Sequence, residues 1–290
     1  MNYSSMLKEE LAIIPSSEES MMAMLSAIIH TAGTLRINRD GISLVISSEN
    51  SNLRELTASL TEHLYNVSPF ADSKRSIVYE GNETLKILLD TGILSYTDGY
   101  EAVAGISPFV VMDSESGLAY LRGAFLGAGS ISTKTNYRAE ISVSGSEFAR
   151  DLTDLLANYG ITAKTVLRKD RCAVYVKGSE NVCDFCALLG GSKTVIKIID
   201  LAMDRLSSQT ANRQTNCDMA NLDRTISVAS MQIDAINRAG QLEGKLLEVA
   251  DARITYPDFS YEQLAEVLHI SKSAVKYRLN KIIEKANGKK

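Results

Sequence analysis

The fold is decided by two related stretches, Leu25-Ser-Ala-Ile-Ile-His-Thr-Ala-Gly-Thr-Leu35 and Leu121-Arg-Gly-Ala-Phe-Leu-Gly-Ala-Gly-Ser-Ile131, which align at an offset of 96 residues. The similarity continues through a strand, a helix, a further strand and a last helix, pairing 42–46 with 139–143, 53–64 with 148–159, 78–79 with 174–175 and 83–92 with 180–190. Self-similarity at a fixed spacing is the signature of a repeated structural unit. The sequence therefore predicts an α+β domain with pseudo-two-fold symmetry.

Small residues recur through the repeated helical stretch in both copies: Ala27, Ala32 and Gly33 in the first, and Gly123, Gly127, Ala128 and Gly129 in the second. A glycine inside a helix costs about 1 kcal/mol relative to alanine, so an ordinary surface helix would avoid three of them. Small side chains let two helix backbones approach closely. We therefore expect the two copies of this helix to pair across the pseudo-dyad.

The C-terminal end of the chain has the pattern of a helix-turn-helix. Ser260 and Gln263 fit a capping box that begins a short helix. His269 stands where a tight turn favours a left-handed backbone, which histidine tolerates, and Ser271 is placed to cap a second helix. An apolar stripe upstream predicts the first helix of the same domain, with Leu242, Leu246, Leu247 and Ala250 on its buried face.

The second helix of this motif is expected to read DNA. Packing Val275 and Leu279 against the preceding helix leaves a polar face, which consists of Ser271, Lys272, Ser273, Lys276, Tyr277 and Asn280. Such a helix lies in the major groove with its N-terminal residues at the base edges. Lys281 and Lys285 are expected to contact the phosphate backbone.

The charge distribution supports a polyanion-binding end. The 290 residues carry 31 Lys and Arg against 35 Asp and Glu, a net charge of −4, but the segment from His269 onward is +6 and residues 1–268 are −10. A basic end on an acidic body is typical of nucleic-acid contact at that end. No apolar run approaches the roughly 18 to 20 residues of a membrane span, and we expect a cytoplasmic, nucleoid-associated protein.

The stretch 121–129 resembles the LAGLIDADG motif of homing endonucleases, whose paired helices form the axis of a saddle-shaped DNA-binding domain. In those enzymes an acidic residue before the final glycine of each motif binds a catalytic divalent metal. The matching positions here are Ala32 and Ala128, and a methyl group offers no hard oxygen ligand. A degenerate body of this kind joined to a helix-turn-helix resembles the WhiA family of bacterial transcription regulators, and this resemblance implies control of cell division, chromosome segregation and sporulation.

A polar segment between the two domains is also similar to that family, through Asn212-Arg213, Asn216-Cys217 and Ala220-Asn221. Arg213 and Arg224 are expected to meet phosphates, while the asparagines cap helices or touch bases. The alternative is a capped helix-loop-helix linker that fixes the spacing of the domains. The sequence favours neither interpretation.

Other chemistry has weak support. Cys183 and Cys186 form a CxxC without a second pair at zinc-binding spacing, so buried thiols are favoured. The three histidines form no ligand set, and we expect His30, inside the first repeated helix, to be a packed or partly buried residue. The glycines of 123–129 do not have the spacing of a dinucleotide-binding loop. We expect no cofactor, no metal, no catalytic residues, and neither a small-molecule substrate nor a membrane as partner.

The predicted organisation is an N-terminal helix with the first repeat in 1–105, the second repeat in 106–191, a helical polar linker in 192–240 and the helix-turn-helix domain in 241–290. The predicted function is a non-enzymatic, sequence-specific regulator that binds double-stranded DNA and has other transcription or division proteins as further partners.

Two alternatives remain open. One is a metal-dependent endonuclease in which Asp40, Glu140 or another carboxylate replaces the lost pair. The other is a protein-interaction scaffold with an auxiliary DNA-binding domain, which the acidic body favours unless its concave face is locally basic. The candidate basic patch of the second repeat consists of Lys134, Arg138, Arg168, Lys169 and Arg171.

Overall fold

The computed structural model describes residues 2–13, 15–38, 41–169 and 171–288. The chain divides into two compact units, Met1–Met203 and Asp204–Lys290. The division falls inside the segment 192–240, so each unit is described by itself below.

The first unit contains the two repeats. The first repeat consists of α2 (Glu18–Ala32), β1 (Gly33–Asn38), β2 (Gly41–Ser47), α3 (Ser51–Tyr65), β3 (Phe70–Ser73), β4 (Ser76–Tyr79) and α4 (Asn82–Asp90). The second consists of α5 (Ser114–Ala128), β7 (Gly129–Ser132), β8 (Arg138–Val143), α6 (Ser146–Asn158), β9 (Lys164–Arg168), β10 (Arg171–Lys177) and α7 (Ser179–Leu189). Their four-stranded antiparallel sheets have the same order, β1-β2-β4-β3 and β7-β8-β10-β9. The predicted duplicated α+β fold is confirmed.

Shorter elements complete this unit. They are α1 (Tyr3–Leu11), the hairpin of β5 (Leu94–Tyr96) and β6 (Tyr100–Ala102), and the 3-10 turn η1 (Pro108–Val111). Helix α1 is joined to the second repeat by the Ser4 hydroxyl, which lies 2.7 Å from the Ile131 amide nitrogen that donates to it. A single apolar core runs through both repeats.

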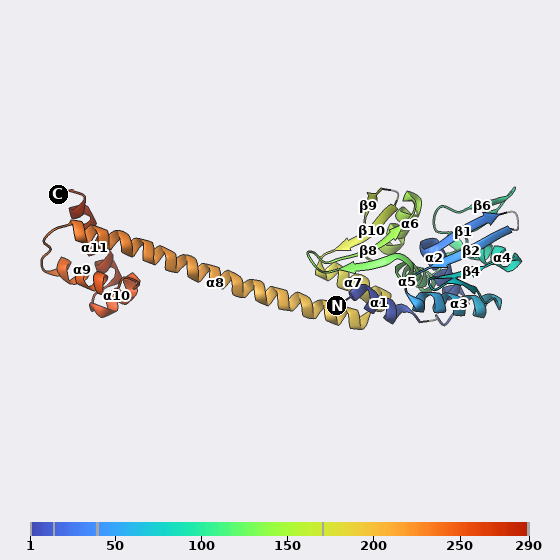
Figure 1. The fold of residues 1–290 in the computed structure, drawn as a ribbon, viewed down its shortest axis with the longest axis horizontal. Coiled ribbons are helices and arrows are strands. Elements are labelled where there is room, and N and C mark those ends of the chain that lie inside the picture. The colour runs from blue at the N-terminus through green and yellow to red at the C-terminus, as the bar shows by residue number, and fades with distance from the viewer. Residues whose placement is uncertain (1, 14, 39–40, 170, 289–290) are drawn as a thin grey trace. The chain divides into compact units, whose positions relative to one another are not determined.

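Helices α2 and α5 pack against each other, and the two sheets flank this pair in Figure 1. A Cβ atom added to Gly123 would lie 2.5 Å from the Met24 carbonyl oxygen and 2.9 Å from the Ala27 Cβ. A Cβ added to Gly127 would collide with the Thr31 hydroxyl. The predicted close approach of the two helices is therefore observed.

Gly33 and Gly129 do not belong to the helices, contrary to the sequence-based expectation. Each ends its helix with an extended backbone and begins a strand. A Cβ at either position would run into the last turn of its own helix, at Ile29 or Phe125. These two glycines permit the sharp change from helix to strand, while Gly123 and Gly127 permit the helix contact.

His30 of α2 is partly buried and packs against aromatic side chains, as expected. Its Nδ1 lies 2.7 Å from the Tyr120 hydroxyl, and its ring lies 4.7 Å from that of Phe148. Burial lowers the pKa of His30 from 6.5 to about 4, because the charged imidazole is poorly solvated there. His30 is therefore neutral at pH 7.

The His30 environment predicts a loss of stability in acid. His30 has a lower pKa in the folded state than in the unfolded chain. Its contribution to the free energy of unfolding is therefore complete above about pH 6.5 and is lost as the pH falls from 6.5 toward 4. His30→Leu should flatten the fall of the melting temperature in that window, measured by calorimetry. His63→Gln, at an exposed position of α3, is the control, and an unchanged pH profile in His30→Leu would contradict the assignment.

The second unit contains the C-terminal part of α8 (Ser192–Arg238) with α9 (Lys245–Thr255), α10 (Tyr261–Val267) and α11 (Lys272–Ala286). Its own apolar core includes Ile236 of α8 and the fully buried side chains Val249, Leu264, Val275, Leu279 and Ile282. An all-α helix-turn-helix domain after the duplicated domain is thus confirmed.

The buried face of α9 differs from the prediction. Leu242 lies before the helix, although it is buried, and Leu247 is 44% exposed. The reason is Gly244, whose positive φ of 56° begins the helix later than the apolar pattern indicates. The buried face therefore contains Val249 and Ala250 rather than Leu247.

The polar segment is helical throughout, so the helix-loop-helix alternative is wrong. Helix α8 continues from Ser192 to Arg238, because this stretch has neither proline nor glycine to interrupt it. Asn212, Asn216 and Asn221 lie inside α8 and are exposed, so they do not cap helix ends. No helix within the described ranges is long and apolar enough to cross a lipid bilayer.

Candidate nucleic-acid interface

Local hydrogen bonds and one left-handed residue fix where α10 and α11 begin. The Ser260 amide donates to the Gln263 side chain at 2.8 Å, and the Gln263 amide donates to the Ser260 hydroxyl at 3.3 Å. His269 has a left-handed φ of 52°. Ser271 then caps α11 by accepting from the Ala274 amide at 3.2 Å. These contacts fix where α11 begins and which face it presents.

Helix α11 buries one face and exposes the other. Val275, Leu279 and Ile282 are at most 1% exposed and pack with Leu264 of α10. All eight residues predicted in this segment for DNA contact are exposed: Ser271, Lys272, Ser273, Lys276, Tyr277, Asn280, Lys281 and Lys285. The structure therefore brings them together on one accessible surface, which we call the α11 face.

The lysines of the α11 face differ in the interactions that their ammonium groups make within the protein. The Lys272 ammonium pairs with the Glu262 carboxylate at 2.7 Å, and the Lys281 ammonium lies 5.7 Å from the Tyr277 ring centroid. Lys285 instead donates to the Gln241 carbonyl oxygen at 2.6 Å. Neither Lys276 nor Asn280 has a side-chain partner among the residues described, so both side chains are available to a ligand.

Two charged contacts in this domain were missed by the sequence analysis. Arg278 is mostly buried and lies 3.9 Å from Glu248 of α9, so it serves the packing of α11 on α9. Arg253 is 1% exposed and points its guanidinium at backbone carbonyls. Apolar periodicity gives no signal for either contact. Arg213, predicted to meet phosphate, is exposed on α8.

The candidate basic patch of the second repeat is partly neutralised. Glu140 of β8 accepts from Arg138 at 2.6 Å and pairs with Arg168 of β9 at 3.1 Å. The Arg138 guanidinium also stacks 3.6 Å from the Tyr175 ring centroid. Arg171 donates to the Ser142 carbonyl oxygen at 3.4 Å, while Lys134 and Lys169 are exposed. The sheet surface is therefore less basic than the sequence indicates.

The positions that correspond to the metal-binding acids hold no oxygen ligand. Ala32 and Ala128 are the last residues of α2 and α5. Glu140, the proposed substitute carboxylate, is engaged by two arginines, and Asp40 lies outside the described residues. Within the part of the chain that the structure describes, no three His, Cys, Asp or Glu side chains gather into a metal site.

The cysteines are free thiols in different environments. Cys172 and Cys186 are buried, Cys183 is partly buried and Cys217 is exposed. Burial raises the pKa of the Cys186 thiol to about 12, which disfavours the reactive thiolate. The predicted burial of the CxxC pair holds fully for Cys186 and in part for Cys183.

Comparisons with known proteins point to one family. Residues 118–206 match the family model described as the WhiA LAGLIDADG-like domain, and residues 211–286 match the WhiA C-terminal HTH domain. The probable cell division protein WhiA of Thermoanaerobacter pseudethanolicus is 33% identical over 98% of this chain and 96% of its own length. That of Streptococcus suis is 32% identical over 97% of both chains.

Solved structures show the same fold. The crystal structure of full-length DUF199/WhiA from Thermatoga maritima matches 99% of each chain with a TM-score of 0.57 and 23% identity. Similarity at this level of identity supports the architecture alone.

Proposed function

The chain belongs to the WhiA family, and from this premise we propose that it is a sequence-specific regulator of transcription without nuclease activity. Its targets serve cell division, chromosome segregation and sporulation. The related chains are named probable cell division proteins, and a DNA-binding helix-turn-helix domain agrees with action through genes. Double-stranded DNA in the nucleoid is the partner, with other transcription or division proteins as further partners.

The α11 face is the observation that supports this proposal. It combines lysines for phosphates with hydroxyls and an amide for base edges, and the opposite, buried apolar side of α11 holds the helix in place. Asparagine reads adenine through two hydrogen bonds, and lysine reads guanine or phosphate. In this proposal residues 241–290 read bases, 192–240 form a helical connection that contributes Arg213, and 1–105 with 106–191 provide the duplicated body.

Genome-wide mapping of bound sites tests this function. Wild type should occupy a limited set of promoters that share a sequence element, because base-edge contacts select among sites. Lys272→Ala with Lys276→Ala should lose most of that occupancy at an equal protein level, measured by chromatin immunoprecipitation. Promoter occupancy that is unchanged in the double variant, or spread evenly over the chromosome in wild type, would contradict the proposal.

Absence of nuclease activity is proposed from the two alanines at the ends of α2 and α5. Two-metal hydrolysis needs carboxylates that hold both ions, and Ala32 and Ala128 provide methyl groups instead. Purified protein should leave supercoiled plasmid intact in the presence of Mg²⁺ or Mn²⁺, at every temperature at which the protein remains folded. Metal-dependent nicking that copurifies with wild type and disappears in Glu140→Gln would instead identify an endonuclease.

A further inference from the structure

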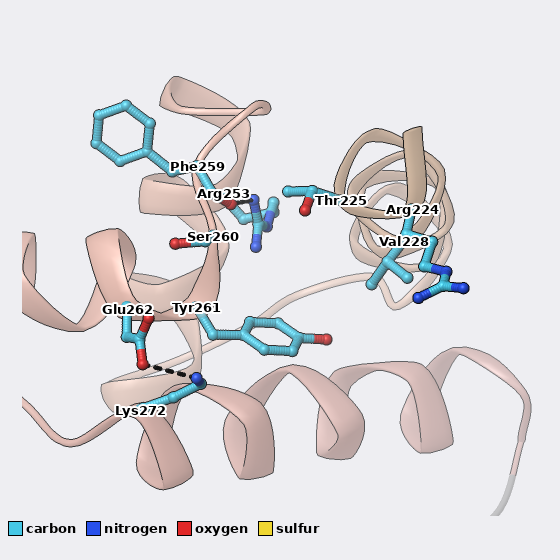
Figure 2. Close-up of a pocket in the computed structure, with 9 residues that line it drawn as sticks. All are labelled: Arg224, Thr225, Val228, Arg253, Phe259, Ser260, Tyr261, Glu262 and Lys272. Atoms are coloured by element: carbon cyan, nitrogen blue, oxygen red, sulfur yellow. Dashed lines mark hydrogen bonds and ion pairs between the residues drawn. The ribbon is translucent and has the colours of Figure 1, made fainter. Parts of the chain in front are cut away.

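One ion pair joins the α11 face to the preceding helix. The Lys272 ammonium donates to the Glu262 carboxylate at 2.7 Å, the contact drawn as a dashed line in Figure 2. Glu262 lies in the first turn of α10, and Lys272 is the first residue of α11. Their side chains are 70% and 58% exposed, so the pair lies on the accessible surface of the domain. Glu262 is therefore an acid beside the surface proposed to meet DNA.

Stability of the fold does not account for this ion pair. Exposed ion pairs contribute little to the free energy of unfolding, because water and salt screen both charges. The start of each helix is fixed by other contacts, since Ser260 and Gln263 cap α10 and Ser271 caps α11. The contact between Glu262 and Lys272 therefore points to a role in binding rather than in packing.

Lys272 differs from its neighbour Lys276 on the same face. The Lys276 ammonium has no side-chain partner within the described residues. A lysine of this kind can exchange its counterion for any phosphate, and that exchange gives affinity for every DNA sequence. Lys272 already has a carboxylate as its counterion, so a phosphate must compete with Glu262 for it. Glu262 thereby limits sequence-independent binding through Lys272.

The ion pair still leaves Lys272 able to read a base. An ammonium has three N–H donors, and Glu262 accepts from one of them. The remaining donors are available to the O6 and N7 acceptors of guanine in the major groove, where the N-terminal residues of such a helix lie. Because Glu262 also fixes the position of the ammonium, a base in register gains this contact more readily than a phosphate does.

We propose that Glu262 positions Lys272 and thereby sets the sequence specificity of the helix-turn-helix. It holds the ammonium for a base edge and away from phosphates, so it lowers the affinity for random DNA more than the affinity for the preferred sequence. Specificity is a difference between two affinities, and weakening the wrong complexes raises it. The inference rests on the proposed DNA-binding function and names a residue that sharpens it.

Glu262→Gln tests this role by fluorescence anisotropy of the full chain with a random duplex and with the mapped operator. The substitution keeps the size of the side chain and releases Lys272 to a phosphate. One added phosphate contact steepens the salt slope by about 0.9 and raises affinity about eightfold at roughly 0.1 M salt, and we expect this gain for the random duplex. Operator affinity should change much less, so the ratio of the two affinities should fall several-fold.

Glu266→Gln is the matched control, because Glu266 is an exposed acid of the same helix with no ion pair among the described residues. It removes the same charge and should leave the ratio of operator to random-duplex affinity as in wild type. Lys272→Ala provides a second background, in which Glu262→Gln should steepen the random-duplex salt slope no more than Glu266→Gln does. Circular dichroism checks that each variant is folded.

Equal effects of Glu262→Gln and Glu266→Gln on random-duplex affinity would overturn the proposal, since net charge alone would then explain both. A gain from Glu262→Gln that persists in Lys272→Ala would also overturn it, because Glu262 would act without the lysine. Neither result affects the preference of wild type for its operator, so the proposed regulatory function would stand. Equal binding of operator and random duplex by wild type would contradict both, and the two failures are thus distinguishable.

Discussion

The variant Lys276→Ala with Asn280→Ala is expected to bind its preferred duplex roughly tenfold to a thousandfold more weakly than wild type. A bidentate contact from an asparagine to adenine is worth about 1–3 kcal/mol of discrimination, and a lysine adds a phosphate or guanine contact. Both residues are exposed on α11 and engage no other described side chain, so the loss falls on DNA binding. Fluorescence anisotropy with the mapped operator at several salt concentrations measures it.

The two substitutions should separate by their salt dependence. Lys276→Ala alone should make the salt slope shallower by about 1 if the lysine meets phosphate, whereas Asn280→Ala alone should leave the slope unchanged and relax base preference. Lys245→Ala on α9 is the matched control for loss of one positive charge. Equal effects of Lys245→Ala and Lys276→Ala on operator affinity would show that net charge, and not the α11 face, governs binding.

The helix-turn-helix could be predicted from sequence because its determinants are local. The capping pair Ser260 and Gln263 is three residues apart, and Ser271 caps α11 at Ala274 over the same spacing. The left-handed turn at His269 follows from the same short segment. Duplication revealed the body in the same way, since each repeat independently indicates the order of helices and strands.

Contacts between distant residues could not be predicted. Lys272 is held by Glu262 from the preceding helix, and Glu140 is shared by Arg138 and Arg168 on adjacent strands. These pairs depend on register and on which turn of a helix faces its neighbour, and neither is encoded by residue type. The number of basic residues on the sheet therefore overstated the positive charge that is left unpaired on its surface.

Two other sequence-based expectations were wrong although the sequence contained the pattern that corrects them. The stretch of α8 contains no helix breaker, which indicates one continuous helix more strongly than its polar composition indicates a loop. The two uses of glycine in 123–129 were merged, although Gly129 begins β7 and Gly123 faces α2. The alternation of polar and apolar residues directly after Gly129, in Ser130-Ile131-Ser132, indicates a strand and so distinguishes Gly129 from the helical glycines.

Gly123→Val should destabilise the duplicated unit by more than about 3 kcal/mol, at the upper end of what overpacking costs. Helix propensity alone favours most residues over glycine by a few tenths to about 1 kcal/mol, so the sign is decided by space. The added Cβ would lie 2.5 Å from the Met24 carbonyl oxygen, and a backbone atom inside a helix cannot move aside as a side chain can. The helices must separate, which disturbs the core that both sheets share. Differential scanning calorimetry of the full chain measures the transition of this unit. Gly99→Ala, where an added Cβ meets nothing within 4 Å, should shift it little, and a wild-type transition in Gly123→Val would contradict close packing of α2 and α5.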